Sequence, residues 1–220
     1  MKNRTDKYGL TLIEMLIVVG IIAILTSLVI GIARRIDNQS KERLAKNTIA
    51  VITSALTQFR DYGYDYNDIN YRVFVFPLDC NGFTKLALET ALANALDATN
   101  VVIGPVNAAK PISHNDPNLS GCEVLYFLLS QVPASRETLD KIDKSLLTDR
   151  DTDINRNEMK ITVNSRDFPL LRVVDPWGDT LRYDYYNETT ADPDSKRTFP
   201  VIISAGPDKI FGTMDDITSK

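Results

Sequence analysis

The chain has 220 residues, of which 44% are hydrophobic and 25% are charged, and its formal net charge is −4. This composition indicates one ordinary folded domain, or a small domain with an appendage, and excludes a collagen-like or wholly disordered chain. The 25 basic residues are spread among 29 acidic ones, which argues against a nucleic-acid-binding protein, and the single histidine excludes a His-rich metal site.

The first feature along the chain is a long apolar segment. Residues 15–33 form a run of 19 residues without a charge, and a short cationic stretch, MKNRTDKYG, opens the chain before them. As a helix this run is roughly 28 Å long, about the thickness of a bilayer core. A buried core helix is the alternative, but such helices are usually amphipathic. The residues after the run, Arg34 to Asp37, do not form a small-residue cleavage site, so we predict a retained membrane anchor.

Glu14 stands directly before this run, and a carboxylate inside an apolar helix is costly in lipid unless something neutralises it. One interpretation places Glu14 at headgroup depth, where it marks the end of the span. The other assumes a cut after Gly9, which gives Leu10 a new α-amino group four residues from Glu14. An ammonium and a carboxylate attract each other strongly in a low-dielectric medium. If the two belong to neighbouring chains, the pair favours assembly.

The sequence GLTLIE at residues 9–14, followed by the apolar run, resembles the processing and methylation signal of type IV prepilins and type II secretion pseudopilins. The resemblance implies a leader over residues 1–9, a cut by prepilin peptidase between Gly9 and Leu10, and methylation of Leu10. It also implies that Glu14 is the carboxylate used in assembly. The expected location is the bacterial inner membrane, with a single span over residues 15–33 and an extracytoplasmic head.

The helix is expected to continue past the apolar run. No proline or glycine lies between Ile32 and Tyr62, and Ile49, Ile52, Leu56 and Phe59 recur at helical spacing. We therefore predict one helix over residues 10–62, with an amphipathic second half that packs on a head formed by residues 63–220.

Within the head, the first elements are expected to be mostly helical. YRVFVF at residues 71–76 predicts a short strand, residues 81–98 a helix, and residues 99–119 a loop that contains His114. Ser120 and Glu123 fit a capping box for the next helix, and a further helix is expected over residues 133–147. We interpret residues 81–147 as a helical insertion, because pilin heads usually need less helix than this.

The C-terminal part is expected to form strands. The predicted strands are Ile161–Val163, Leu170–Val174, Leu181–Tyr186 and Phe199–Ser204, and a turn at Asp175–Asp179 predicts a hairpin. A long helix followed by a β region over about residues 161–220 makes the predicted fold class α+β. The resemblance implies, more narrowly, a pilin-like fold.

The tail SAGPDKIFGTMDDI, residues 204–217, places carboxylates in a Gly/Pro-rich loop, which is compatible with Ca²⁺ or with a solvated acidic loop. It resembles the C-terminal calcium loop of the major pseudopilin. The resemblance implies Ca²⁺ ligands at Asp208, Asp215 and Asp216 and at the carbonyl of Ala205. Lys209 stands where a glycine is usual and Met214 where an acid is usual. A second acidic stretch, residues 151–158, is interpreted as a solvated linker.

The two cysteines leave an alternative open. Cys80 and Cys122 could form a disulfide in an extracytoplasmic head, or they could be two unrelated buried thiols. His114 is interpreted as an exposed loop residue. The sequence contains no phosphate-binding or nucleophile motif, so no catalytic function is expected.

Two functional hypotheses follow. In the first, the chain is a structural subunit of a pseudopilus or type IV pilus-like filament that serves type II secretion. Its partners are then copies of itself, minor pseudopilins, prepilin peptidase, the inner-membrane assembly platform and, before assembly, membrane lipid. In the second, the chain is a membrane-tethered binding or enzymatic domain that does not polymerise, and Gly9 and Glu14 have no special role.

Overall fold

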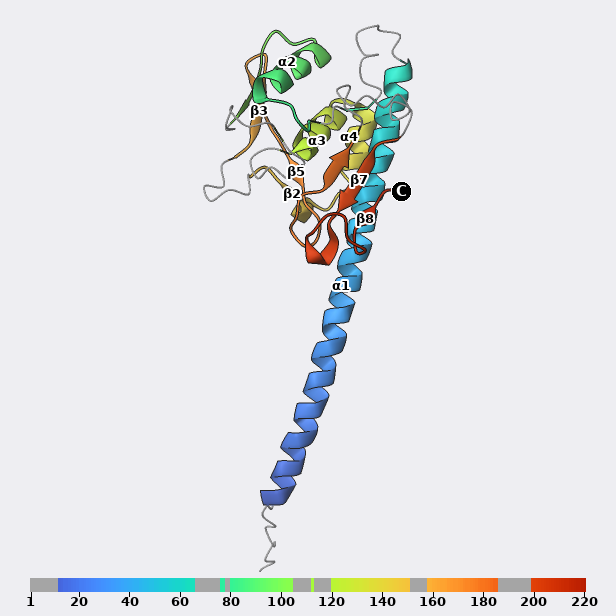
Figure 1. The fold of residues 1–220 in the computed structure, drawn as a ribbon, viewed down its shortest axis with the longest axis vertical. Coiled ribbons are helices and arrows are strands. Elements are labelled where there is room, and N and C mark those ends of the chain that lie inside the picture. Colours follow the sequence, from blue (N-terminus) through green and yellow to red (C-terminus); the bar gives the residue numbers. More distant parts are fainter. Residues whose placement is uncertain are drawn as a thin grey trace, which may run out of the picture. The chain divides into compact units, whose positions relative to one another are not determined.

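A computed structural model of the chain describes residues 12–65, 76–77, 80–104, 112, 120–150, 158–185 and 199–220, without the side chains of 28–34 and 63–65. The fold is α+β, as predicted: a long N-terminal helix is combined with small antiparallel sheets, which is consistent with a pilin-like fold (Figure 1). The chain divides into two compact units, one ending at Lys41 and one formed by Glu42–Lys220.

The longest element is helix α1, Leu12–Asp65. It continues three residues beyond the predicted end at Tyr62, because Gly63 does not stop it. Threonines along its second half donate side-chain hydrogen bonds to carbonyls one turn earlier, among them Thr48 to Leu44 at 2.9 Å and Thr53 to Ile49 at 2.8 Å. These polar side chains are therefore satisfied without leaving the helix.

The Glu42–Lys220 unit contains two hydrophobic cores. The first contains the predicted apolar stripe of α1, with Ile49, Ile52 and Leu56 at most 3% exposed. Against this stripe pack residues of the sheet β6–β7–β8, formed by Arg182–Asp184, Val201–Ser204 and Ile217–Thr218. Tyr183, Ile202 and Ile217 belong to this core, and β7 and β8 lie beside α1 in Figure 1. The stripe is thus a core face, as predicted.

The second core lies under the sheet β1–β3–β4. Its strands are Val101–Gly104, Lys160–Val163 and Arg166–Pro169, and helix α2, Lys85–Ala95, contacts β1. Strands β3 and β4 join through a tight turn at Asn164 and Ser165, which both have positive φ. This geometry matches the right-handed twist of a two-residue hairpin.

Helix α3, Gly121–Gln131, contributes to both cores. Cys122, Leu125 and Leu129 belong to the first core, whereas Val124, Phe127 and Leu128 belong to the second. The predicted capping box is confirmed, because Ser120 caps the helix and Glu123 accepts a hydrogen bond from the Ser120 backbone N–H at 3.0 Å. A helix that is apolar on two faces is expected to lie between two packed layers.

The remaining elements are short. Helix α4 covers Pro133–Leu139, the 3₁₀ turns η2 and η4 cover Lys144–Leu146 and Gly206–Asp208, and strands β2 and β5, Leu147–Thr148 and Arg172–Val173, pair with each other. The predicted helix over 133–147 is therefore wrong beyond Leu139, since the chain turns there and enters β2.

Besides β2, three strands depart from the prediction. Strand β1 lies in a segment predicted as loop, because its pairing with β3 outweighs the neighbouring glycine and proline. Strand β4 precedes the predicted strand at 170–174, and β8 was not predicted. Helix α2 begins later than residue 81, because Thr84 caps it. The predicted strand Tyr71–Phe76, apart from Phe76, lies outside the described residues.

Candidate functional site

The first candidate site is the N-terminal part of α1, which exposes an unusual amount of apolar surface. Every large hydrophobic side chain from Leu12 to Leu25 is between 44% and 85% exposed. Because these residues are nearly consecutive, the apolar surface covers all sides of the helix. Burying one such side chain is worth about 1.5–3 kcal/mol, so this surface favours lipid or another apolar partner.

The polar groups in this part of α1 suit an apolar environment. Thr26 Oγ1 donates to the Ile22 carbonyl and Ser27 Oγ to the Ile24 carbonyl, each at 2.7 Å. Both hydroxyls are therefore satisfied within the helix, as lipid would require. Gly20 has open space around the position of an added Cβ, so no packing contact in the described chain requires a glycine there.

Glu14 lies in the first turn of α1, where the positive end of the helix dipole favours a carboxylate. It is exposed, like the apolar residues around it. Gly9 and Leu10, the predicted cleavage and methylation positions, lie outside the described residues. The same holds for His114 and for the acidic stretch up to residue 157.

The second candidate site is the C-terminal loop, which we define as residues 205–216. Its carboxylates accept hydrogen bonds from the loop itself. Asp208 Oδ1 accepts from the Ile210 N–H at 2.8 Å, Asp215 Oδ2 from the Asp208 N–H at 3.1 Å, and Asp216 Oδ2 from the Gly212 N–H at 2.7 Å. The acidic side chains of the loop thus hold its backbone in place through hydrogen bonds.

Asp215 accepts hydrogen bonds at both of its carboxylate oxygens. Its Oδ1 accepts a hydrogen bond of 2.6 Å from the Thr213 hydroxyl. This hydrogen bond, followed by backbone N–H donors, lowers the pKa of Asp215 below 3.8. Gly206 has a positive φ of 69°, and a Cβ there would lie 2.4 Å from the Asp215 carbonyl oxygen. Only glycine allows this close approach.

The end of β7, which leads into the C-terminal loop, is tied to a second segment, the Asp175 turn, which we define as Asp175–Asp179. Asp175 is buried, and its Oδ1 accepts from the backbone N–H groups of Trp177 at 3.0 Å and Asp179 at 2.9 Å. Its Oδ2 accepts from the Ser204 hydroxyl at 2.6 Å. The Asp175 carboxylate therefore shapes its own turn and holds the end of β7 beside it.

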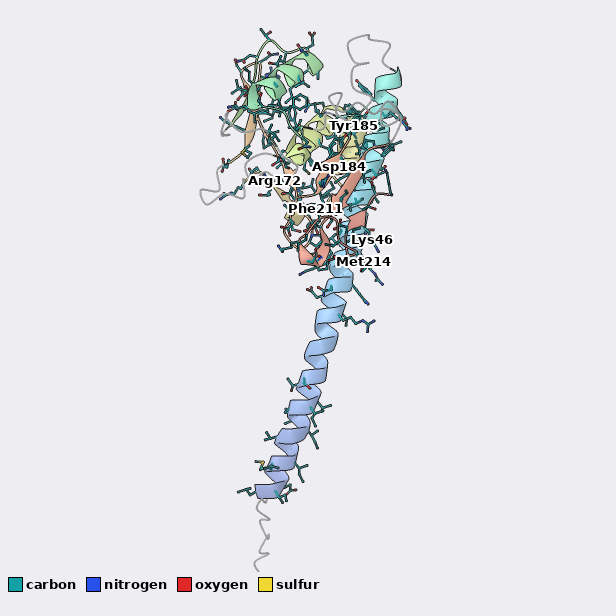
Figure 2. The ribbon with its side chains drawn as sticks, in the orientation of Figure 1. Lys46, Arg172, Asp184, Tyr185, Phe211 and Met214 are labelled. Atoms are coloured by element: carbon teal, nitrogen blue, oxygen red, sulfur yellow. The ribbon has the colours of Figure 1, made fainter. Side chains whose placement is uncertain are left out.

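Lys209 forms a further link between the two segments. Its Nζ donates to the Trp177 carbonyl at 2.7 Å and lies 3.0 Å from Asp179 Oδ2. Among the residues that the structure describes, Asp179 Oδ2 has no hydrogen-bond partner of good geometry, so its contact with the ammonium is electrostatic. Met214 is fully exposed on the same loop (Figure 2).

The predicted side-chain ligands for calcium, Asp208, Asp215 and Asp216, all lie in the C-terminal loop. Ca²⁺ needs about 6–8 converging oxygens. The structure brings Asp208 and Asp215 together, and Asp216 Oδ1 is buried with no hydrogen-bond partner in the described segments. However, in the described part of the chain no three acidic, histidine or cysteine side chains gather closely enough to hold a metal. The carboxylates alone do not form such a site, and calcium stays a prediction.

The two cysteines are present as thiols and not as a disulfide. Cys122 belongs to the first core and Cys80 to the second, so separate packing environments hold them. Of the two alternatives, the structure therefore has the unrelated buried thiols. Burial, together with the neighbouring Glu123, raises the pKa of the Cys122 thiol to about 12. The protonated, buried thiol is unreactive at neutral pH.

One buried ion pair was not predicted. Glu123 and Arg172 are both at most 2% exposed, and Arg172 Nε donates to Glu123 Oε1 at 2.6 Å. Glu123 Oε2 also accepts from the Ser120 hydroxyl. The pair links α3 to β5. The capping box identified Glu123, but no local pattern pointed to Arg172, which lies 49 residues later.

In a comparison with known families, residues 4–30 match the family described as Prokaryotic N-terminal methylation motif. This match identifies the N-terminus as a signal of the type IV pilin and pseudopilin kind, a substrate of prepilin peptidase, and it suggests membrane anchoring. Searches of curated proteins and of solved structures find no match. Among the residues that the structure describes, no helix has both the length and the apolar character that crossing a membrane requires.

Proposed function

We propose that this chain is a structural subunit of a pseudopilus or type IV pilus-like filament that serves type II protein secretion. The observation that carries the proposal is the methylation motif at residues 4–30, which coincides with the part of α1 that exposes apolar side chains on all sides. A subunit that polymerises through its helix needs such a surface, because neighbouring helices bury it after assembly.

In this proposal, the subunit is inserted into the bacterial inner membrane before it assembles. Residues 15–33 anchor the chain as a single span with the head outside the cytoplasm, and prepilin peptidase removes residues 1–9. Support comes from the Thr26 and Ser27 hydroxyls, which are satisfied within the helix and so add little cost in lipid. The minor pseudopilins and the assembly platform act on the processed chain.

Glu14 is the proposed assembly carboxylate. After the cut, the amino group of Leu10 in one chain pairs with Glu14 of a neighbour. The pair is worth most in a low-dielectric environment, so it directs a chain from lipid into the filament. The proposed role of the chain is structural, and it has no catalytic step.

The proposal is tested with the full chain, expressed together with prepilin peptidase and an assembly platform. Wild-type protein is expected to begin at N-methylated Leu10, by mass spectrometry, and to appear in sheared filaments. Glu14→Ala should be cleaved and membrane-inserted but absent from filaments. Glu42→Ala is the matched control, because Glu42 lies on the same helix in an exposed pair with Lys46 and should assemble normally.

Two outcomes would contradict the proposal. A wild-type chain that keeps Met1 and stays monomeric would favour the alternative, a membrane-tethered binding domain. Filaments of normal abundance from Glu14→Ala would remove the role assigned to that carboxylate.

A further inference from the structure

The C-terminal loop contains a lysine in a conformation that usually favours glycine. Lys209 has φ 63° and ψ 23°, in the left-handed region, directly after the 3₁₀ turn η4. A side chain with a Cβ is strained in this conformation, so the surrounding contacts must compensate for it.

The Lys209 side chain makes polar contacts with the Asp175 turn, whereas its backbone N–H donates to the Gly206 carbonyl. The ammonium donates to the Trp177 carbonyl at 2.7 Å and lies 3.0 Å from the Asp179 carboxylate. One positive charge thus contacts a carbonyl oxygen and a carboxylate oxygen of a segment about 30 residues earlier in the chain. A bound cation would make the same type of contacts if it linked the two segments.

The acidic residues of the loop are engaged in a different way. Asp208, Asp215 and Asp216 each accept a backbone N–H from within the loop, and in the described residues they do not form a three-carboxylate group. Their charges are therefore used to shape the loop. The contact with the Asp175 turn is made by Ser204 and Lys209 instead.

We infer that the Lys209 ammonium holds the C-terminal loop against the Asp175 turn in place of a divalent cation, so that the loop closes without calcium. This inference departs from the calcium site that the family resemblance implies. It does not depend on the proposed filament function, because it concerns only contacts within Glu42–Lys220.

The experiment measures amide hydrogen exchange in the full chain, purified in detergent. The reporters are the amides of Asp208, Ile210 and Gly212, which donate hydrogen bonds to carboxylates of the loop itself and so report on its order. Wild-type rates are compared in EDTA and in excess CaCl₂. We expect them to be equal, because no metal takes part in closure.

Lys209→Gln removes the charge and keeps a side chain of similar length. We expect the three reporter amides to exchange about three- to tenfold faster, which corresponds to the loss of a partly exposed ion pair and a charge-assisted hydrogen bond. Lys160→Gln is the matched control, since it breaks another exposed lysine–aspartate pair, 2.6 Å to Asp167, in the β3–β4 hairpin. The control should leave the reporter amides unchanged.

Asp179→Asn gives an independent test that leaves Lys209 in place, and it should accelerate the same amides. The inference is overturned if EDTA accelerates the reporter amides of the wild type or if calcium slows them, and this result would support the calcium prediction. It is also overturned if both Lys209→Gln and Asp179→Asn exchange at the wild-type rate.

Discussion

The two parts of helix α1 are rich in apolar side chains but differ in what surrounds them. From Leu12 to Leu25 the large hydrophobic side chains are at least 44% exposed, whereas Ile49, Ile52 and Leu56 are at most 3% exposed. The sequence pattern differs in the same way, since the first part is apolar on all sides and the second only along one stripe. A stripe can be covered by one head, but a fully apolar helix needs neighbours on all sides.

This difference shows that one helix can serve two purposes. The second part is a structural element of the Glu42–Lys220 unit. It stabilises that unit through contacts within the same chain. The first part has no such cover in the described chain, so its apolar surface is available to lipid or to other subunits. Mutations in the two parts should therefore have different consequences, even when the substitution is the same.

The largest expected effect on the free energy of unfolding comes from breaking the buried ion pair between Glu123 and Arg172. Glu123→Ala removes the carboxylate to which the buried Arg172 donates, and we expect the free energy of unfolding to fall by about 3–5 kcal/mol. Glu42→Ala, in the exposed pair with Lys46, should change it by no more than about 1 kcal/mol. Urea unfolding of the full chain in detergent measures both. If both variants lost the same free energy of unfolding, the expected difference between a buried and an exposed ion pair would be contradicted.

An intermediate effect on stability is expected when the same substitution, isoleucine to alanine, is made in each of the two parts of α1. Ile52→Ala, at a site 1% exposed, should lower the free energy of unfolding by about 2–5 kcal/mol, because it leaves a cavity in the first core. Ile24→Ala, at a site 64% exposed, should change it by less than about 0.5 kcal/mol. Thermal unfolding of the Glu42–Lys220 unit within the full chain measures the difference. A comparable loss from Ile24→Ala would show that its segment is also part of this core.

The smallest expected effect is on the pKa of a single carboxylate in the Glu42–Lys220 unit, that of Asp215. Thr213→Val removes the hydrogen bond that lowers the pKa of Asp215 most, so this pKa should rise toward 3.8. Because the folded pKa is the lower one, ionised Asp215 stabilises the loop above pH 3.8, and this stabilisation is lost as the pH falls through the folded pKa. In Thr213→Val this stabilisation should be smaller, and its loss should be complete at a higher pH, because the folded pKa then lies closer to 3.8.

An NMR pH titration of the Asp215 carboxyl carbon measures this change. Asp167 provides an internal control, because Lys160 and Thr162 lower its pKa independently of the C-terminal loop. A shift at both aspartates, or at neither, would contradict the assignment.

Features that depend on neighbouring residues in the sequence were predicted well. The apolar run and its helix, the amphipathic stripe through Ile49 and Ile52, and the capping box at Ser120 all follow from spacing over a few residues. Elements were predicted less well where pairing decides the structure. Val101–Gly104 is a strand because Val163 and its neighbours pair with it, and the helix after Pro133 ends at Leu139 because the chain enters a strand pair.

The candidate sites show the same division between features set by neighbouring residues and features set by long-range contacts. The motif around Gly9 and Glu14 could be identified from the sequence, since its residues are adjacent. Lys209 was noted only as a departure from a usual glycine. Its contact with Asp179 could not be predicted, because nothing local indicates that the Asp175 turn and the C-terminal loop meet.

Residue type and short-range periodicity were enough to predict the N-terminal signal, the apolar helix that follows it and the α+β class. The tertiary structure decided which side chains meet across long stretches of chain. It placed Cys80 and Cys122 in separate cores, paired Glu123 with Arg172, and brought the Lys209 ammonium to the Asp175 turn. These contacts depend on how sheets and helices pack, and packing is a property of the whole folded chain.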